Sequence, residues 1–163
     1  EWDEEDEDRE EFDPDDYDSE VQFDENFYYS IGDEGIIISE YVGSDMYVII
    51  PEEVDGMPVR EIGEWAFATK NIVSVVIPEG VTSIGYSAFY ECSQLTEITL
   101  PDSLLTIGEW AFAKTALEEI YIPDGIETLG EFAFQDSENV VVYLWGEAYT
   151  YEVAKKLMLE IEE

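Results

Sequence analysis

The sequence predicts an α/β solenoid with a parallel β-sheet, because one phrase recurs at a regular spacing and follows a proline each time. The phrase is I/L-G-x-x-A-F, and its copies are Ile62–Phe67, Ile84–Phe89, Ile107–Phe112 and Leu129–Phe134. The phenylalanines that end these copies are 22, 23 and 22 residues apart. A run of β-type residues ending in proline precedes each copy. Self-similarity with a period of about 20 to 50 residues is typical of solenoids.

Each repeat is predicted to contain a short strand, a corner and a turn, as the unit from Ile72 to Phe89 illustrates. Alternating apolar residues such as Val75 should point inward from the strand, and Pro78 should end it because proline has no N–H for the ladder. Gly85 is interpreted as permitting a tight turn, and the Ala-Phe pair as a short helical turn with Phe89 inward. One such unit cannot bury its apolar face alone, so the repeats must stack.

The longer phrase I-G-x-x-A-F…C-x-x-L-x-x-I-x-L-P is complete between Ile84 and Pro101. It resembles the BspA-type leucine-rich repeat family of bacterial surface proteins, and the resemblance covers roughly Tyr41 to Glu152. The resemblance implies a right-handed leucine-rich-repeat solenoid, a protein-binding role and an extracellular or cell-surface location, with the signal for that location absent from this sequence. Many leucine-rich repeats place asparagine eight residues after the first leucine, where this chain has Gly80, Ser103 and Gly125. A buried amide ladder is therefore not expected.

Residues 1–22 are predicted to be a disordered acidic linker. They hold 14 acids and one base, Arg9, without a periodic apolar face, and such segments repel themselves and cannot build a core. The alternative is calcium association, since hard oxygen ligands are plentiful around Asp13, Asp15, Asp16 and Asp18. These residues lack the spacing of an EF-hand loop, so the linker is favoured and only weak calcium association is left open.

Residues 23–163 are predicted to form a single domain of a cap, the repeats and a second cap. Residues 23–45 should be an N-terminal hairpin cap, because two apolar runs flank the glycine-bounded turn Gly32–Gly35. The repeats should occupy residues 46–139, with an inserted loop at 53–58 on the edge of the sheet. Residues 140–163 should close the end with one more strand and then a helix, since apolar spacing becomes helical from Tyr149 to Leu157.

The composition excludes several classes of function. The chain has 42 acids, 6 bases and no histidine, for a net charge of −36. Nucleic acids and anionic lipids require a basic face, so basic partners are expected instead, and no apolar run is long enough to insert into a membrane. Without histidine there is no Ser-His-Asp triad and no imidazole metal site, so we expect no enzyme, cofactor or metal. The single cysteine, Cys92, is interpreted as a small buried turn residue, because Thr115 and Ser137 occupy equivalent positions.

Two surfaces are candidates for binding. The first is the outward side of the parallel sheet, which the residues two and four positions before each proline should line. These are Tyr47, Ile49, Ser74, Val76, Glu97, Thr99, Glu119 and Tyr121, with Tyr143 in the last strand. The second is the position before each Ala-Phe pair, where the aromatic members are Trp65, Trp110 and Phe132. Rigid aromatic side chains are frequent binding anchors, but the second row is interpreted mainly as shielding the turns.

Two hypotheses for the function follow. The first is a non-enzymatic, adhesion-like protein-interaction module of a bacterial surface or secreted protein. The alternative is a carbohydrate-recognition or docking module of a secreted enzyme system, with exposed aromatic rings against the faces of sugars. A hydrolase is disfavoured because carboxylates such as Glu97 and Glu109 fall at outward repeat positions, where they are solvated rather than held in a cleft.

Overall fold

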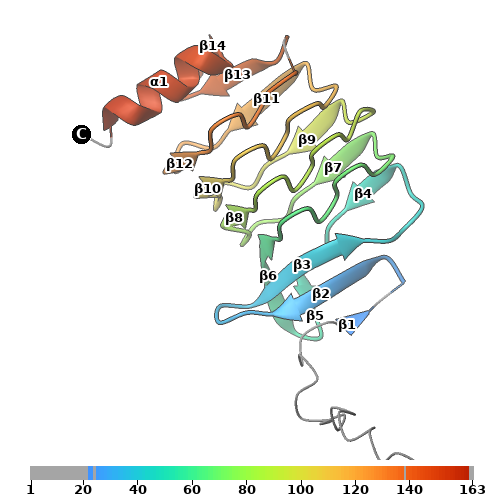
Figure 1. Ribbon diagram of the computed structural model, residues 1–163. Coiled ribbons are helices and arrows are strands. Elements are labelled where there is room, and N and C mark those ends of the chain that lie inside the picture. Colours follow the sequence, from blue (N-terminus) through green and yellow to red (C-terminus); the bar gives the residue numbers. More distant parts are fainter. Residues whose placement is uncertain (1–21, 24, 138, 162–163) are drawn as a thin grey trace, which may run out of the picture.

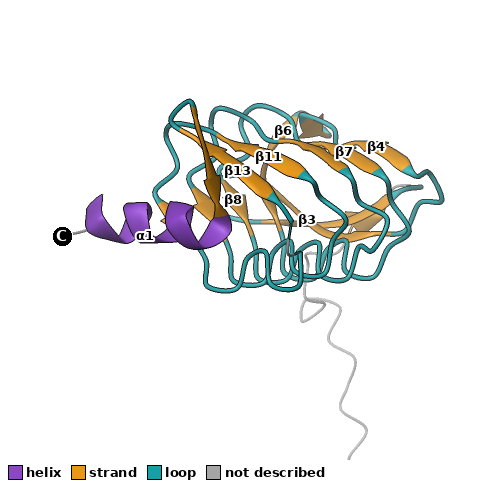
Figure 2. Cartoon of the chain, turned by 90° about the horizontal axis from the view of Figure 1, so that it is seen from above, coloured by secondary structure: helices purple, strands orange, loops and turns teal. Residues whose placement is uncertain are grey.

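The computed structural model describes residues 22–23, 25–137 and 139–161. The predicted acidic linker and its calcium association therefore fall outside the described residues, except that Gln22 belongs to a strand, β1 (Gln22–Phe23). From there the chain winds into a solenoid whose layers follow one another from β3 to the C-terminal helix (Figure 1). Each full repeat contributes a strand to each of two rows and a group of turns on the remaining side (Figure 2).

The first row of strands forms what we call the strand face. It consists of β4 (Tyr47–Ile49), β7 (Ser74–Val76), β9 (Glu97–Thr99), β11 (Glu119–Ile122) and β13 (Val141–Leu144). Hydrogen bonds join β4, β7 and β9 into one parallel sheet, and join β11 to β13 in a second sheet that β14 (Glu147–Thr150) extends in antiparallel fashion. The predicted parallel sheet is thus present, with one strand per repeat.

The second row of strands continues into the N-terminal hairpin. Its repeat strands are β6 (Met57–Ile62), β8 (Ser83–Ile84), β10 (Thr106–Ile107) and β12 (Thr128–Leu129). They are preceded by β2 (Phe27–Ile31) and β3 (Ile36–Tyr41), where β3 pairs antiparallel with β2 and parallel with β6. The inserted loop is a small hairpin in which β5 (Glu53–Val54) pairs antiparallel with β6.

The third side of the solenoid is made of tight turns, and the prediction of short helical turns is wrong. In the turn after Gly63, the N–H groups of Ala66 and Ala68 donate to residues three positions earlier. The N–H groups that alternate with these, from Trp65 and Phe67, instead donate to carbonyls of the next repeat. Because every second amide leaves the turn to join the adjacent layer, a continuous helical ladder cannot form. Trp65 accordingly has a left-handed φ of 59°.

A column of glycines sits where consecutive layers approach most closely, at Gly63, Gly85, Gly108 and Gly130. A Cβ atom on Gly108 would lie 2.7 Å from the carbonyl carbon of Gly85. This corrects the interpretation of Gly85 as a residue that permits a tight turn. Because Gly85 has no Cβ, the backbone of the neighbouring layer can lie against it. The left-handed positions of each turn are occupied by other residues.

The repeat phenylalanines point into the core, as the sequence analysis expects of Phe89, and they stack on one another there. Phe67, Phe89, Phe112 and Phe134 are buried, and consecutive ring centroids are 4.9, 5.3 and 5.5 Å apart with nearly parallel planes. Cys92 is also buried, and its thiol donates to the carbonyl of Phe67 at 2.9 Å. Burial raises the pKa of this thiol to about 12. The interpretation of Cys92 as a buried turn residue is therefore confirmed.

The C-terminal end carries the one helix in the described part of the chain, α1 (Tyr151–Ile161). It starts later than predicted, because Tyr149 belongs to β14. Ala154 and Met158 are buried, whereas Val153, which the apolar spacing placed inward, is 45% exposed. The hydroxyl of Tyr151 donates to the carbonyl of Gly130 at 2.8 Å and ties the helix to the last repeat. Among the described residues, no helix has the length and apolar character needed to cross a membrane.

Candidate functional site

All nine residues predicted for the sheet surface lie on the strand face, and the ladder aligns them in rows. Tyr47, Ser74 and Glu97 are register partners in one row, and Ile49, Val76 and Thr99 form the next. In the second sheet, Tyr121 is paired with Tyr143, and Glu119 with Val141. Residues that alternate with them are turned into the core, where Val48, Val75 and Ile120 are buried.

The strand face has two apolar ends and a polar middle. Ile49, Tyr47 and Tyr121 are 76%, 72% and 59% exposed, the highest values among the exposed large hydrophobic residues of the described chain. Between these ends lie the exposed side chains of Glu97 and Thr99. Val141 is also exposed beside Tyr143, and the sequence analysis missed it because β13 is not followed by the proline that marked the other strands. The alternation within the strand could have revealed it.

The C-terminal half of this face carries a pair of stacked tyrosines. The rings of Tyr121 and Tyr143 are 4.4 Å apart between centroids and inclined by 7°. Loss of hydration, followed by the negative charge of Glu119, raises the pKa of Tyr121 above its ordinary value. A hollow of about 570 Å³ adjoins the pair and is lined in addition by Asp102 and Asp124. An aromatic surface beside carboxylates can receive a cationic side chain.

The strand face is interrupted between β9 and β11, which belong to separate hydrogen-bonded sheets. Ile98 of β9 is only partly buried, although its counterparts Val75 and Ile120 are fully buried. The loops before the strands differ in length: Cys92 stands three residues before Leu95, whereas the equivalent Thr115 stands two before Leu117. The loop before β7 is shorter than that before β9 by the same one residue, yet β7 and β9 pair in register, so loop length does not explain the interruption.

The aromatic row on the turn side is brought together by contacts among its own rings. Trp65 packs edge-on against Tyr86 and Tyr90, at 5.6 Å in both cases. Trp110 lies 4.9 Å from Phe132. The sequence analysis missed Tyr86 and Tyr90, which flank the Ser-Ala-Phe segment of their repeat. The rings of this row are thus engaged with one another.

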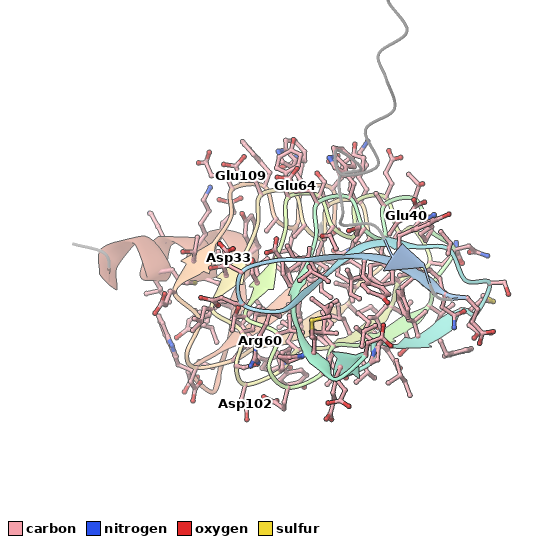
Figure 3. The ribbon with its side chains drawn as sticks, turned by 90° about the horizontal axis from the view of Figure 1, so that it is seen from below. Asp33, Glu40, Arg60, Glu64, Asp102 and Glu109 are labelled. Carbon is pink, nitrogen blue, oxygen red and sulfur yellow. The ribbon has the colours of Figure 1, made fainter. Side chains whose placement is uncertain are left out.

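The described residues do not converge into a metal centre. No group of three or more Cys, Asp or Glu side chains among them is placed to hold a metal ion. Figure 3 shows Glu64 and Glu109 on the turn side and Asp102 on the opposite side of the solenoid. A hollow of about 620 Å³ lies between the last repeat and β14, where Phe134, Tyr149 and Tyr151 contribute to its lining.

The comparisons with known proteins agree with this architecture. The sequence profile of the BspA type leucine rich repeat region matches residues 58–145 in six copies. The crystal structure of a leucine-rich repeat protein from Bacteroides capillosus ATCC 29799 is 34% identical, with 78% of this chain and 99% of that chain covered and a TM-score of 0.69. A leucine-rich repeat protein of T. pallidum is 29% identical, with 75% of this chain and 70% of that one covered and a TM-score of 0.64.

A third solved structure shares the fold. It is a leucine-rich repeat protein from Bacteroides ovatus ATCC 8483 that is 24% identical, with 77% of this chain and 41% of that chain covered and a TM-score of 0.55. No curated protein matches the sequence. The matched repeats include most of the strand face, the glycine column and the phenylalanine stack. The chain therefore belongs to the BspA-type leucine-rich repeat family.

Proposed function

We propose that the protein is a non-enzymatic protein-interaction module whose strand face binds a basic segment of another protein. The observation that carries this proposal is the stack of exposed Tyr121 on half-buried Tyr143, which lie on two paired strands. Membership of a leucine-rich repeat family supports it, because solenoids present extended surfaces on which partners bind.

The stacked pair is suited to binding because it is already ordered before the partner arrives. Four consecutive register pairs join β11 to β13, which fixes the backbone beneath both rings. Tyrosine loses little conformational entropy on binding, and a preorganised side chain loses less still. Together with Val141 the pair forms the apolar centre of the C-terminal half of the face.

The charge of the strand face indicates a basic partner. Its five strands contain no lysine or arginine. Glu97 and Glu119 are exposed on the face, and Asp102 and Asp124 line the adjoining hollow. A lysine or arginine placed over Tyr121 would combine a cation–π contact with these carboxylates. The acidic surroundings would mainly raise the association rate, and this increase would become smaller as salt is added.

The biological setting belongs to the same proposal. An adhesion-like role at a bacterial surface or in secreted form is supported by the family, with which such locations are associated. A net charge of −36 is compatible with this setting, because it favours solubility and recognition of basic proteins.

The test compares two double variants that remove aromatic rings from opposite sides of the solenoid. Immobilised protein is used to capture partners from extracellular-matrix and bacterial-surface extracts, and the captured protein is then titrated against each variant. Tyr121→Ala/Tyr143→Ala should weaken binding by about 1–2 kcal/mol for each ring, whereas Trp65→Ala/Trp110→Ala should bind as the unaltered protein does. Circular dichroism and thermal unfolding check that both variants fold. Loss of binding in the tryptophan variant alone would refute the assignment.

Carbohydrate recognition is the second candidate, and the observation that favours it is the exposure of Trp65, which is 48% exposed on the turn side. A sugar ring stacked on Trp65 or Trp110 would quench tryptophan fluorescence. Titration with soluble glycans therefore separates the two candidates, because binding at the tyrosine pair alone leaves the fluorescence of Trp65 and Trp110 unquenched. Quenching that disappears in Trp65→Ala would favour the carbohydrate hypothesis.

A further inference from the structure

Strand β4 has one edge that pairs with nothing in the described chain. It pairs with β7 on one side only. The carbonyl of Met46 accepts hydrogen bonds from Val73 and Ser74 at 2.7 and 3.2 Å, and the N–H of Ile50 donates to the carbonyl of Val76 at 3.0 Å. Backbone groups of consecutive strand residues point to opposite sides, so those of Tyr47 and Ile49 point away from β7.

The N-terminal hairpin leaves this edge open. Its strand β3 pairs with β6 and with β2, which extends the second row of strands and not the strand face. Met46, Tyr47 and Ile49 are all exposed. Native proteins usually blunt a free edge with a very short strand, with lysine or proline, or with a bulge, and β4 has three residues. No lysine or proline occurs from Met46 to Ile50, and the β4–β7 register has no irregularity.

We propose that the free edge of β4 binds an extended basic segment of a partner protein by strand addition. The backbone of Tyr47 and Ile49 offers two N–H donors and two carbonyl acceptors, which is what an added strand requires. Apolar side chains of the added strand would lie beside Tyr47 and Ile49 as cross-strand neighbours. This mode uses backbone groups at the end of the sheet and does not depend on the tyrosine pair.

Charge decides between a basic partner and a second copy of this chain. Residues 42–59 contain Asp45, Glu52, Glu53 and Asp55 and no lysine or arginine. A second copy would bring the same acids to the edge along with its own net charge of −36, and like charges at close range oppose association. A basic segment would instead be attracted by the negative charge of this part of the chain.

The test uses a defined probe, a capped peptide of about ten residues that alternates valine and lysine. A control peptide of equal charge carries two prolines in its centre and cannot form a strand. Hydrogen exchange of the protein is measured with each peptide at about 0.15 M salt. The alternating peptide should slow exchange at the amides of Tyr47 and Ile49, and the control peptide should not.

A pair of variants at one position separates the backbone contribution from charge. Ile49→Pro removes the outward N–H and leaves the hydrogen bonds to β7, because those come from Val48 and Ile50. It should weaken binding of the alternating peptide about tenfold. Ile49→Thr keeps that N–H and should bind more tightly than Ile49→Pro. Protection of the Ser74 and Val76 amides checks that β7 still pairs with β4.

Three outcomes would overturn the proposal. Equal binding of both peptides would mean attraction by charge alone. Protection of Tyr47 and Ile49 without peptide, together with a dimer in sedimentation, would assign the edge to a second copy. Absence of slowed exchange in the unaltered protein at saturating peptide would exclude strand addition, and this measurement needs no variant.

Discussion

Replacing Gly108 by alanine tests whether consecutive layers of the solenoid are in direct backbone contact. The new Cβ would lie 2.7 Å from the carbonyl carbon of Gly85, 2.8 Å from the nitrogen of Tyr86 and 2.9 Å from the oxygen of Gly85. All three are backbone atoms and cannot rotate away. Ordinary contact therefore requires the layers to separate by about 0.7–1 Å.

That separation carries a second cost. The N–H of Gly108 donates to the carbonyl of Ile84 at 2.8 Å, and a shift of this size lengthens the bond beyond hydrogen-bonding distance. Overpacking typically costs about 1–3 kcal/mol and a lost hydrogen bond about 1 kcal/mol. We therefore expect Gly108→Ala to lower the free energy of unfolding by about 2–4 kcal/mol.

Gly125 supplies the matched control, because it is a glycine at a corner of the same solenoid with open space around it. The nearest heavy atom to a Cβ there is the carbonyl oxygen of Asp102, at 3.9 Å. Gly125→Ala should be neutral or stabilise by up to about 1 kcal/mol, because alanine restricts the unfolded chain. Urea unfolding followed by tryptophan fluorescence measures both variants. If the free energies of unfolding of the two variants differ by less than about 1 kcal/mol, direct backbone contact between the layers is refuted.

Two further predictions concern the ends and the core. Deleting residues 151–163 removes the Tyr151 ring, whose centroid lies 5.3 Å from that of Phe134. The shortened protein should therefore have a lower melting temperature and should self-associate in gel filtration. A monomer with an unchanged melting temperature would contradict this. Cys92, with its pKa raised to about 12 by burial, should react with a thiol reagent only as fast as the protein unfolds. Because the pKa of Cys92 is higher in the folded protein than in the unfolded chain, its contribution to stability is complete below about pH 9 and is lost as the pH rises toward 12. A Cys92→Ser variant whose stability has the same pH profile would exclude this linkage.

The repeats and the strand face could be predicted from the sequence because both depend on local periodicity. The spacing of Phe67, Phe89 and Phe112 fixes which residues stack, and alternation before each proline fixes which point outward. Its distance from Pro123 places Tyr121 in the outward row, whereas Tyr143, whose strand has no following proline, is placed there by the alternation within its own strand. No contact beyond the repeat is needed for these inferences.

The turns and the interruptions could not be predicted, because they depend on contacts between layers. The Ala-Phe segments favour a helix when considered alone. In the structure, however, the N–H groups of Trp65 and Phe67 donate to carbonyls of the next repeat instead of to their own turn. The role of Gly85 likewise becomes visible only when the backbone of Gly63 is placed beside it. The open edge of β4 depends on which row the N-terminal hairpin extends, which its own sequence does not specify.

The unequal loops before β9 and β11 bear on how such a protein can change during evolution. Copying a whole repeat preserves the phenylalanine stack and the glycine column, since both recur once per unit. A single-residue insertion or deletion elsewhere in the unit would misalign one of them. The loop from Cys92 to Leu95 and its shorter counterpart from Thr115 to Leu117 show the corner that absorbs such a change. Strands β7 and β9, whose preceding loops differ by the same one residue, stay paired in register, so the solenoid can vary in repeat length at this corner while its interior stays aligned.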